Sequence, residues 1–169
     1  SLTNLMKDLN LFYDAVARGQ EYHVIYLDFS KAFDTVSHSK LLCKLGNLGI
    51  QGKVLGWITA FLSFRSQKVK VGNSFSESAW VISGVPQGSV LGPLLFLLYV
   101  NDLPYYIQNS DISLYADDSK VRKRILTSDD SVSLQHDLNC ILSWSRTWQL
   151  SLSISKCSVL VIGQLVTAM

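Results

Sequence analysis

Two strand patterns in this sequence end in carboxylates, and this placement restricts the folds that the chain can adopt. Residues 23–27 form a short apolar run rich in β-forming residues, and Asp28 follows it directly. Residues 112–121 read as a strand, a tight turn and a second strand, with Asp117 and Asp118 at the turn. Carboxylates at the ends of apolar strands are costly unless a cation or a partner lies there. If the strands are neighbours in one sheet, the three carboxylates converge.

The rest of the sequence alternates helix and strand patterns. Helical spacing of apolar residues predicts helices at residues 2–17, 37–48 (with Ser37 as the cap), 53–64, 94–103 and 129–147. Strand patterns predict a β-hairpin from 67–71 and 77–82, and two short strands at 150–154 and 158–162. This order is typical of an α+β domain, an antiparallel sheet with helices packed on one face.

Composition narrows the function classes. The longest apolar stretch, 90–100, is broken by Gly92 and Pro93 and is shorter than the roughly 20 residues of a membrane span. The net charge of +2 is only mildly basic, so charge alone does not indicate a nucleic-acid binder. The three cysteines are far apart and show no metal-site or disulfide spacing.

Charged residues make up only 17% of the chain, against roughly a quarter in ordinary soluble domains. This deficit, and a first residue that is Ser1, predict an internal fragment whose surface is partly covered in a longer protein.

Clustered carboxylates repel one another and favour hard divalent cations such as Mg²⁺. Two such ions could activate a primer 3′-hydroxyl and stabilise a leaving pyrophosphate. The alternative for an isolated Asp-Asp pair at a turn is turn chemistry alone, because aspartate favours turn conformations.

Three motifs distinguish these alternatives. Residues 26–34 (YLDFSKAFD) resemble motif A of the reverse transcriptases, residues 83–93 (SGVPQGSVLGP) resemble motif B, and residues 115–118 (YADD) resemble motif C. They occur in the family's order, and the wording of motifs A and B is similar to the chicken-repeat and jockey-like branches of non-LTR (LINE-type) retrotransposons.

The resemblance implies a polymerase palm with part of the fingers in residues 1–163, a tail at 164–169, and no thumb. It implies an RNA-directed DNA polymerase that uses Mg²⁺, for which Mn²⁺ could substitute. The implied partners are an RNA template, a DNA primer and dNTPs, together with the missing fingers and thumb segments of the parent polyprotein. No membrane partner is expected, and the implied location is the nucleus. Since those segments are absent, we expect the fragment alone to polymerise weakly or not at all.

The family's residue roles are carried over by position. Asp28, Asp117 and Asp118 would be the catalytic metal-binding triad, joined by the main chain of Phe29. The nucleotide would contact Ser30, Lys31, Ala32, Phe33, Pro86, Gln87, Gly88 and Lys156. Phe33 stands where the family keeps an aromatic gate against the ribose 2′-hydroxyl.

Some of these residues have a second interpretation. Phe33 could simply pack in the core, and Lys156, the proposed proton donor to pyrophosphate, could be a solvated surface lysine. Asp34 could cap the following helix or support the metal site from outside its ligand shell.

Basic residues near two of the motifs could bind template and primer phosphates. Arg65, Lys68 and Lys70 lie in the predicted hairpin, and Lys120, Arg122, Lys123 and Arg124 follow the Asp-Asp turn. Alternation places Lys120, Arg122 and Arg124 on one side of a strand; the alternative is a solvated charged face.

Three rival functions remain open at this level. A viral-type RNA-templated RNA polymerase shares the palm, but the aromatic Phe33 argues against it. A decayed or non-catalytic palm remnant could bind nucleic acid or a partner protein, although its triad is intact. An unrelated metal-dependent phosphohydrolase would have no need of the Pro86-Gln87-Gly88 loop.

Overall fold

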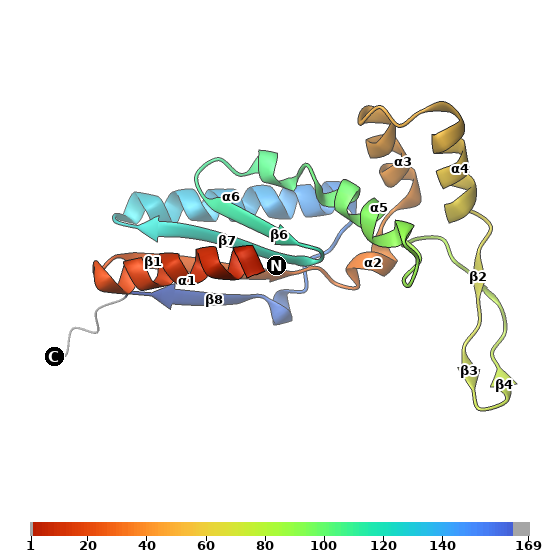
Figure 1. Ribbon diagram of the computed structural model, residues 1–169, viewed down its shortest axis with the longest axis horizontal. Coiled ribbons are helices and arrows are strands. Elements are labelled where there is room, and N and C mark those ends of the chain that lie inside the picture. The colour runs from red at the N-terminus through yellow and green to blue at the C-terminus, as the bar shows by residue number, and fades with distance from the viewer. Residues whose placement is uncertain (1, 164–169) are drawn as a thin grey trace. The chain divides into compact units, whose positions relative to one another are not determined.

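The structure is a computed structural model that describes residues 2–163, without the side chains of residues 2–5 and 7. The predicted tail at 164–169, and the part of Leu5 in the first helix face, therefore lie outside the described residues. The chain forms two compact units (Figure 1). The first comprises the described parts of Ser1–Ser30, Asp102–Thr147 and Ser151–Met169, and the second comprises Lys31–Asn101 and Trp148–Leu150.

The first unit is built on a four-stranded antiparallel sheet. Its strands are β1 (Glu21–Asp28), β6 (Asp111–Tyr115), β7 (Asp118–Ile125) and β8 (Ser158–Ile162), in the order β6-β7-β1-β8. Each strand pairs antiparallel with its neighbour, as the sequence predicts. The buried residues Val24, Ile25, Leu27 and Val121 belong to the two central strands, so the sheet is anchored through β1 and β7.

Helices cover both faces of this sheet, which corrects the prediction of helices on one face. Helix α1 (Leu2–Ala17) contributes Asp8, which binds Lys120 of β7. Helix α6 (Ser128–Trp148) contributes Trp144, whose ring lies 6.1 Å from that of Phe29, just after β1. Lys120 and Phe29 point to opposite sides because successive strand residues alternate. Figure 1 shows α1 in front of the strands and α6 behind them.

The predicted strand at 150–154 is wrong. Only Leu152 forms a β-bridge, with Phe29, and a short 3-10 helix, η2 (Ile154–Lys156), follows. The alternation of leucine and serine in this stretch reads as a strand, but β1 ends at Asp28 and leaves little edge for it to pair with. A second 3-10 helix, η1 (Leu103–Tyr106), precedes β6.

The second unit is helical with one extended arm. Its helices are α2 (Ala32–Thr35), α3 (His38–Asn47), α4 (Gly52–Leu62) and α5 (Leu91–Val100). The arm is the predicted hairpin, in which β2 (Ser66–Gln67) pairs with β5 (Ala79–Trp80) and β3 (Lys70–Val71) pairs with β4 (Ser74–Phe75). The pairing is much shorter than the sequence predicts, and every residue of the four strands is exposed.

Two helix starts differ in detail from prediction. Ser37 occupies the N-cap position of α3, but its side chain makes no capping hydrogen bond. Helix α5 begins at Leu91, earlier than the predicted residue 94. It can include Pro93 because a proline in the first helical turn lacks only an N–H that has no partner within the helix. None of the helices within residues 2–163 is long and apolar enough to cross a membrane.

Candidate active site

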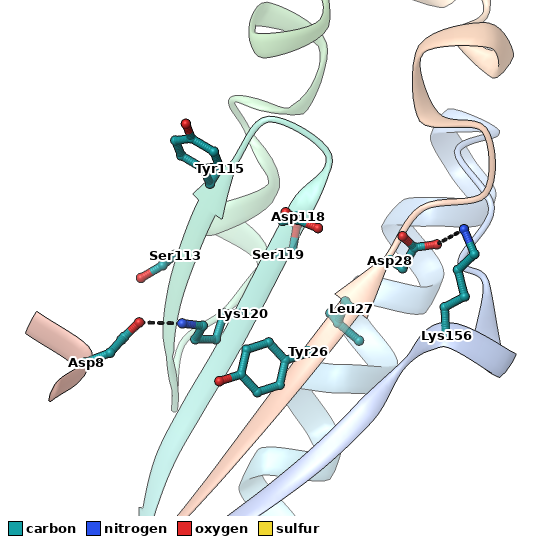
Figure 2. Close-up of a pocket in the computed structure, with 10 residues that line it drawn as sticks. All are labelled: Asp8, Tyr26, Leu27, Asp28, Ser113, Tyr115, Asp118, Ser119, Lys120 and Lys156. Atoms are coloured by element: carbon teal, nitrogen blue, oxygen red, sulfur yellow. Dashed lines mark hydrogen bonds and ion pairs between the residues drawn. The ribbon is translucent and has the colours of Figure 1, made fainter. Parts of the chain in front are cut away.

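Two of the three predicted metal-binding carboxylates meet at one end of the sheet of the first unit. Asp28, the last residue of β1, lies directly opposite Asp118, the first residue of β7, in the antiparallel register. Both side chains therefore leave the same face of the sheet. The sequence predicted this meeting on the condition that the two strands are neighbours, and they are. Figure 2 shows both carboxylates at the same end of the paired strands.

Asp117 occupies the tip of the β6–β7 hairpin. Tyr115 pairs with Asp118, so Ala116 and Asp117 form a two-residue turn. Ala116 has a φ of 52°, a left-handed conformation that is unfavourable for alanine. Two-residue hairpins need positive φ at the first turn position to match strand twist. The strain at Ala116 is thus the conformational cost of turning the chain immediately before Asp118.

The segment Ser151–Ser153 fixes the main chain on the other side of Asp28. The amide of Ser153 donates to the carbonyl of Asp28 at 2.8 Å, and the amide of Ser30 donates to the carbonyl of Ser151 at 2.8 Å. In this antiparallel pattern the amide and carbonyl of Phe29 point away from Leu152, toward the β7 side. The main chain of Phe29 is thereby directed to the side on which Asp118 lies.

Lys156 lies beside the first aspartate. Its Nζ is 3.5 Å from Oδ2 of Asp28, a long ion pair, while the lysine side chain remains 69% exposed. Oδ2 of Asp28 is buried and accepts no hydrogen bond. Figure 2 shows Lys156 reaching Asp28 from the side opposite to Asp118. A buried carboxylate oxygen with only a distant, exposed lysine as partner is a favourable position for a cation.

These residues open onto a pocket of about 410 Å³. Its lining combines acidic, basic, aromatic and hydroxyl side chains: Asp8, Tyr26, Leu27, Asp28, Ser113, Tyr115, Asp118, Ser119, Lys120 and Lys156. Asp117 does not line it.

The carboxylate oxygens of Asp28 and Asp118 suit a hard cation whose remaining ligands come from water and substrate. Within residues 2–163 no group of three or more His, Cys, Asp or Glu side chains is arranged to hold a metal ion, so the three aspartates do not form a closed cage. Mg²⁺ seldom needs one, because it commonly binds one or two carboxylates together with waters and substrate phosphates. Asp28 and Asp118, with an Oδ2 on Asp28 that accepts no hydrogen bond, fit that pattern.

Asp8 is a site residue that the sequence did not reveal. Its buried carboxylate binds both Lys120 and Arg122, and Arg122 also donates to Ser113 at 3.1 Å. Lys120 lies over the ring of Tyr26, 5.1 Å from its centroid. Two cations predicted to face nucleic acid thus have a carboxylate partner within the unit. Asp8 and Lys120 are 112 positions apart in the sequence, so no local pattern signals this pairing.

In the second unit the end of motif A and the start of motif B are joined along their main chains. The amide of Val85 donates to the carbonyl of Phe33 at 2.7 Å, and the amide of Gly84 donates to that of Val36 at 2.8 Å. A Cβ at Gly84 would lie 2.7 Å from the carbonyl oxygen of Asp34, so only glycine permits this approach.

Asp34 does not cap the helix that follows, whereas its support of the metal site stays a prediction. It lies inside α2, and its Oδ1 accepts a hydrogen bond of 2.9 Å from Nε2 of Gln87. The sequence separation of 53 residues concealed this contact.

Phe33 packs within the second unit. Its ring stacks on Phe96 with centroids 4.5 Å apart and planes inclined by 22°, and it remains partly exposed. Packing and a gating role are both compatible with this position, so the gate stays a prediction.

The remaining predicted contact residues fall in both units. Ser30 is the last residue of the first segment of the first unit. Lys31 is exposed, has a φ of 47° and precedes α2, whose first residue, Ala32, is buried. Pro86 is half-buried and Gly88 is exposed with a φ of 80°. Arg65 donates to the carbonyls of Leu62 and Gly84, each at 3.2 Å, while Lys68 lies exposed on the arm.

The sequence matches the family described as "Reverse transcriptase (RNA-dependent DNA polymerase)" over residues 3–165, nearly the whole chain. The chain belongs to the reverse transcriptase family. The predicted family and its nucleotidyltransferase class are thereby confirmed.

Curated relatives of this reverse transcriptase come from mobile elements. It is 33% identical over 150 residues to the RNA-directed DNA polymerase from mobile element jockey of Drosophila melanogaster, covering 82% of this chain and 16% of that protein. It is 32% identical over 146 residues to the probable RNA-directed DNA polymerase from transposon BS of the same fly, covering 81% of this chain and 16% of that protein. The predicted likeness to jockey-like elements is confirmed. The chain spans about a sixth of the length of these relatives.

Solved structures with the same fold include two yeast telomerases. Apo telomerase from Candida tropicalis superimposes with a TM-score of 0.70 at 11% identity, covering 99% of this chain and 36% of that one. Telomerase from Candida albicans, solved with a fragment of telomeric RNA, gives 0.69 at 15% identity, covering 100% and 31%. At these identities the likeness shows the fold alone, and it supports the predicted α+β reverse transcriptase architecture.

Proposed function

We propose that this chain is the catalytic part of an RNA-directed DNA polymerase of a non-LTR retrotransposon, and that it adds deoxynucleotides to a primer 3′-hydroxyl with two divalent ions. The observation that carries the proposal is the register of β1 and β7, which brings Asp28 and Asp118 together with a buried oxygen on Asp28 that accepts no hydrogen bond. The family match and the relatives support it.

The residues at the end of the sheet would have different roles in the reaction. Asp28 and Asp118 would hold Mg²⁺, assisted by Asp117 and by the main chain of Phe29. Such ions, when bound, activate the primer hydroxyl and stabilise the charge of the leaving pyrophosphate. Nζ of Lys156 lies 3.5 Å from Oδ2 of Asp28, where an ammonium group could assist departure of pyrophosphate as a general acid.

The second unit would select the nucleotide. Phe33 would exclude a ribose 2′-hydroxyl, while Pro86, Gln87 and Gly88 would contact the nucleotide and template. Support comes from the main-chain hydrogen bond of Val85 to Phe33 and the side-chain hydrogen bond of Gln87 to Asp34, because a selective site needs rigidly held residues.

The proposed partners are an RNA template, a DNA primer, dNTPs and further segments of a parent polyprotein, and the proposed location is the nucleus. Arg65 and the exposed Lys68 are the candidate phosphate contacts of the second unit.

Primer extension tests the proposal directly. An RNA template, a DNA primer and dNTPs with Mg²⁺ or Mn²⁺ would be combined with the wild-type chain, with Asp118→Asn and with Asp111→Asn. The last variant removes a carboxylate from the same hairpin, at the exposed far end of β6. We expect the weak extension of which the chain alone is capable to persist in Asp111→Asn and to be absent in Asp118→Asn; undiminished extension by Asp118→Asn would contradict the proposal.

One observation favours a second candidate, a palm remnant that binds nucleic acid or a protein without catalysis. Lys156 already pairs with Asp28, as would suit a site that no longer holds a cation. Such a remnant would extend no primer, and its nucleic-acid affinity would not change with Mg²⁺ or on replacing Asp117 with Asn. A Mg²⁺-dependent affinity that Asp117→Asn abolishes would exclude the remnant.

A further inference from the structure

The side chains of Asp34 and Gln87 form a contact that the motif roles do not explain. Nε2 of Gln87 donates to Oδ1 of Asp34 at 2.9 Å, and both side chains are exposed. An exposed hydrogen bond of this kind adds little to stability, because water competes for both groups. The main effect of this hydrogen bond is therefore on the orientation of the Gln87 side chain.

The carboxylate determines which end of the amide is outward. An ionised carboxylate only accepts hydrogen bonds, whereas the amide of Gln87 has one donor end and one acceptor end. Although amide orientation is assigned from hydrogen bonding, an acceptor-only partner leaves one choice, with Nε2 toward Asp34. Oε1 of Gln87 is then the end left to meet a ligand.

The main chain beneath the pair is rigidly held. Oγ of Ser83 donates to the carbonyl of Asp34 at 2.8 Å, and Gly84 approaches the same carbonyl too closely for any Cβ. On the other side, a Cβ at Gly92 would lie 2.3 Å from the carbonyl oxygen of Pro86, so motif B is also packed tightly against the start of α5. Asp34 and Gln87 are thus presented from fixed backbones, which is the condition for one side chain to orient another.

Both side chains line a polar pocket of about 890 Å³ within the second unit. Lys31 and Arg65 also line it, and Arg65 donates to the carbonyls of Leu62 and Gly84. A ligand entering this pocket meets Oε1 of Gln87 as an acceptor, so it must offer a hydrogen-bond donor.

We infer that Asp34 is a positioning residue that orients Gln87 to accept a hydrogen bond from the incoming nucleotide, either from a sugar hydroxyl or from an exocyclic amino group of the base. The inference rests on the proposed function, since it takes a nucleotide as the ligand of this pocket. Asp34 itself contacts no reacting atom.

The first experiment uses a reciprocal exchange. Asp34→Ala removes the partner of Gln87, while Asp34→Asn combined with Gln87→Glu reverses the bond, because the asparagine donates and a second glutamate oxygen still faces outward. Glu77→Gln, an exposed change on the arm, is the control. We expect Asp34→Ala to raise the KM for dATP roughly tenfold with little change in kcat or in Tm. The double variant that reverses the bond should bring the KM most of the way back to the wild-type value.

Two analogues identify the donor. With 2′,3′-dideoxyadenosine triphosphate the effect of Asp34→Ala should vanish if the donor is the 3′-hydroxyl. With purine deoxyriboside triphosphate, which lacks the exocyclic amino group, the effect of Asp34→Ala should vanish if that amino group is the donor. Equal loss with all three nucleotides would overturn the inference, as would a fall in kcat and Tm without a change in KM.

A second readout needs no catalysis. The side-chain amide of Gln87 should give a shifted and exchange-protected signal by nuclear magnetic resonance in the wild type, and Asp34→Ala should remove it. Adding dATP should perturb this signal in the wild type and far less in Asp34→Ala. If the wild type extends no primer but the signal responds in this way, the positioning role stands although the chain alone is not an active polymerase. An unprotected amide, or one indifferent to dATP, would overturn the positioning role.

Discussion

Asp28 and Asp118 are direct partners in the antiparallel register of β1 and β7, and they leave the same face of the sheet. Two like charges placed opposite each other destabilise a sheet unless something neutralises them. Lys156, at 3.5 Å from Asp28 and largely exposed, does so only in part. The arrangement therefore has a consequence for stability as well as for catalysis.

Without divalent cations, Asp118→Asn should raise the free energy of unfolding by about 0.2–1 kcal/mol, because it removes this repulsion. Urea denaturation in EDTA measures the change. Adding Mg²⁺ should then raise the Tm of the wild type more than that of the variant, since a ligand stabilises the state that binds it. A variant less stable than the wild type in EDTA, or equal Mg²⁺ responses, would refute the argument.

Replacing Phe33 separates its two interpretations. Phe33→Ala removes the stack on Phe96, an aromatic pair that contributes about 0.5–1.5 kcal/mol beyond its buried area. If the ring is also the gate, the ratio of ribonucleotide to deoxynucleotide incorporation should rise sharply, while Phe33→Tyr, which keeps the bulk, should leave it unchanged. Lower stability with an unaltered ratio in Phe33→Ala would leave only the packing role.

The sheet and the meeting of its carboxylates could be predicted because they follow from local patterns. The apolar run before Asp28 and the two-residue turn before Asp118 each specify a strand end, and antiparallel pairing brings those ends together. The resemblance of three motifs to those of the reverse transcriptases then indicated the family, which the comparison confirms.

Contacts between distant residues could not be predicted in this way. The face of β7 that carries Lys120 and Arg122 reads as solvent-exposed, because nothing near it in sequence shows that Asp8 of α1 neutralises it. The alternation at Leu150 to Ile154 reads as a strand, because a local pattern cannot show where the edge of β1 ends. The contact of Asp34 with Gln87 is hidden for the same reason.

The pairing of Asp8 with Lys120 and Arg122 gives a prediction about nucleic-acid binding. A cation that contacts a phosphate contributes roughly 0.9 to the slope of log affinity against log salt concentration. Lys68→Gln, on the exposed arm, should lower the slope by about that amount if the arm binds template or primer. Lys120→Gln should change it little, because Asp8 already neutralises that charge. Fluorescence anisotropy with an RNA–DNA duplex at several salt concentrations measures both slopes. If Lys120→Gln lowers the slope by as much as a phosphate contact contributes, about 0.9, the phosphate displaces Asp8 from Lys120.

The lowered pKa of Asp137 predicts how acidic pH changes the stability of the first unit. Burial of this carboxylate alone would raise its pKa, but hydrogen bonds from the Asn109 side chain and from the amides of Gln108 and Asn109 outweigh burial and hold the pKa below its usual 3.8. Its stabilising contribution is therefore complete above pH 3.8 and is lost as pH falls through the lower folded-state pKa. Asp137→Ala should cost about 1.5–3 kcal/mol at neutral pH. Urea unfolding should show that the difference in free energy of unfolding between Asp137→Ala and the wild type becomes smaller below pH 3.8. A difference that does not change with pH would contradict the lowered pKa of Asp137.

Lys156 can be tested apart from the carboxylates. Because the lysine is 69% exposed, its ion pair with Asp28 should add no more than about 1 kcal/mol to stability, so Lys156→Ala should leave the Tm nearly unchanged. If Lys156 protonates the leaving pyrophosphate, the same variant should slow single-nucleotide extension by about 100-fold or more under single-turnover conditions. Lys156→Arg keeps the charge but is a much weaker acid, so it should restore little of the rate. Lys53→Ala, an exposed lysine of α4, is the control for loss of one positive charge. An extension rate in Lys156→Ala equal to that of the control would assign Lys156 to the solvated surface, whereas full recovery in Lys156→Arg would mean that its charge, and not its proton, is what the reaction uses.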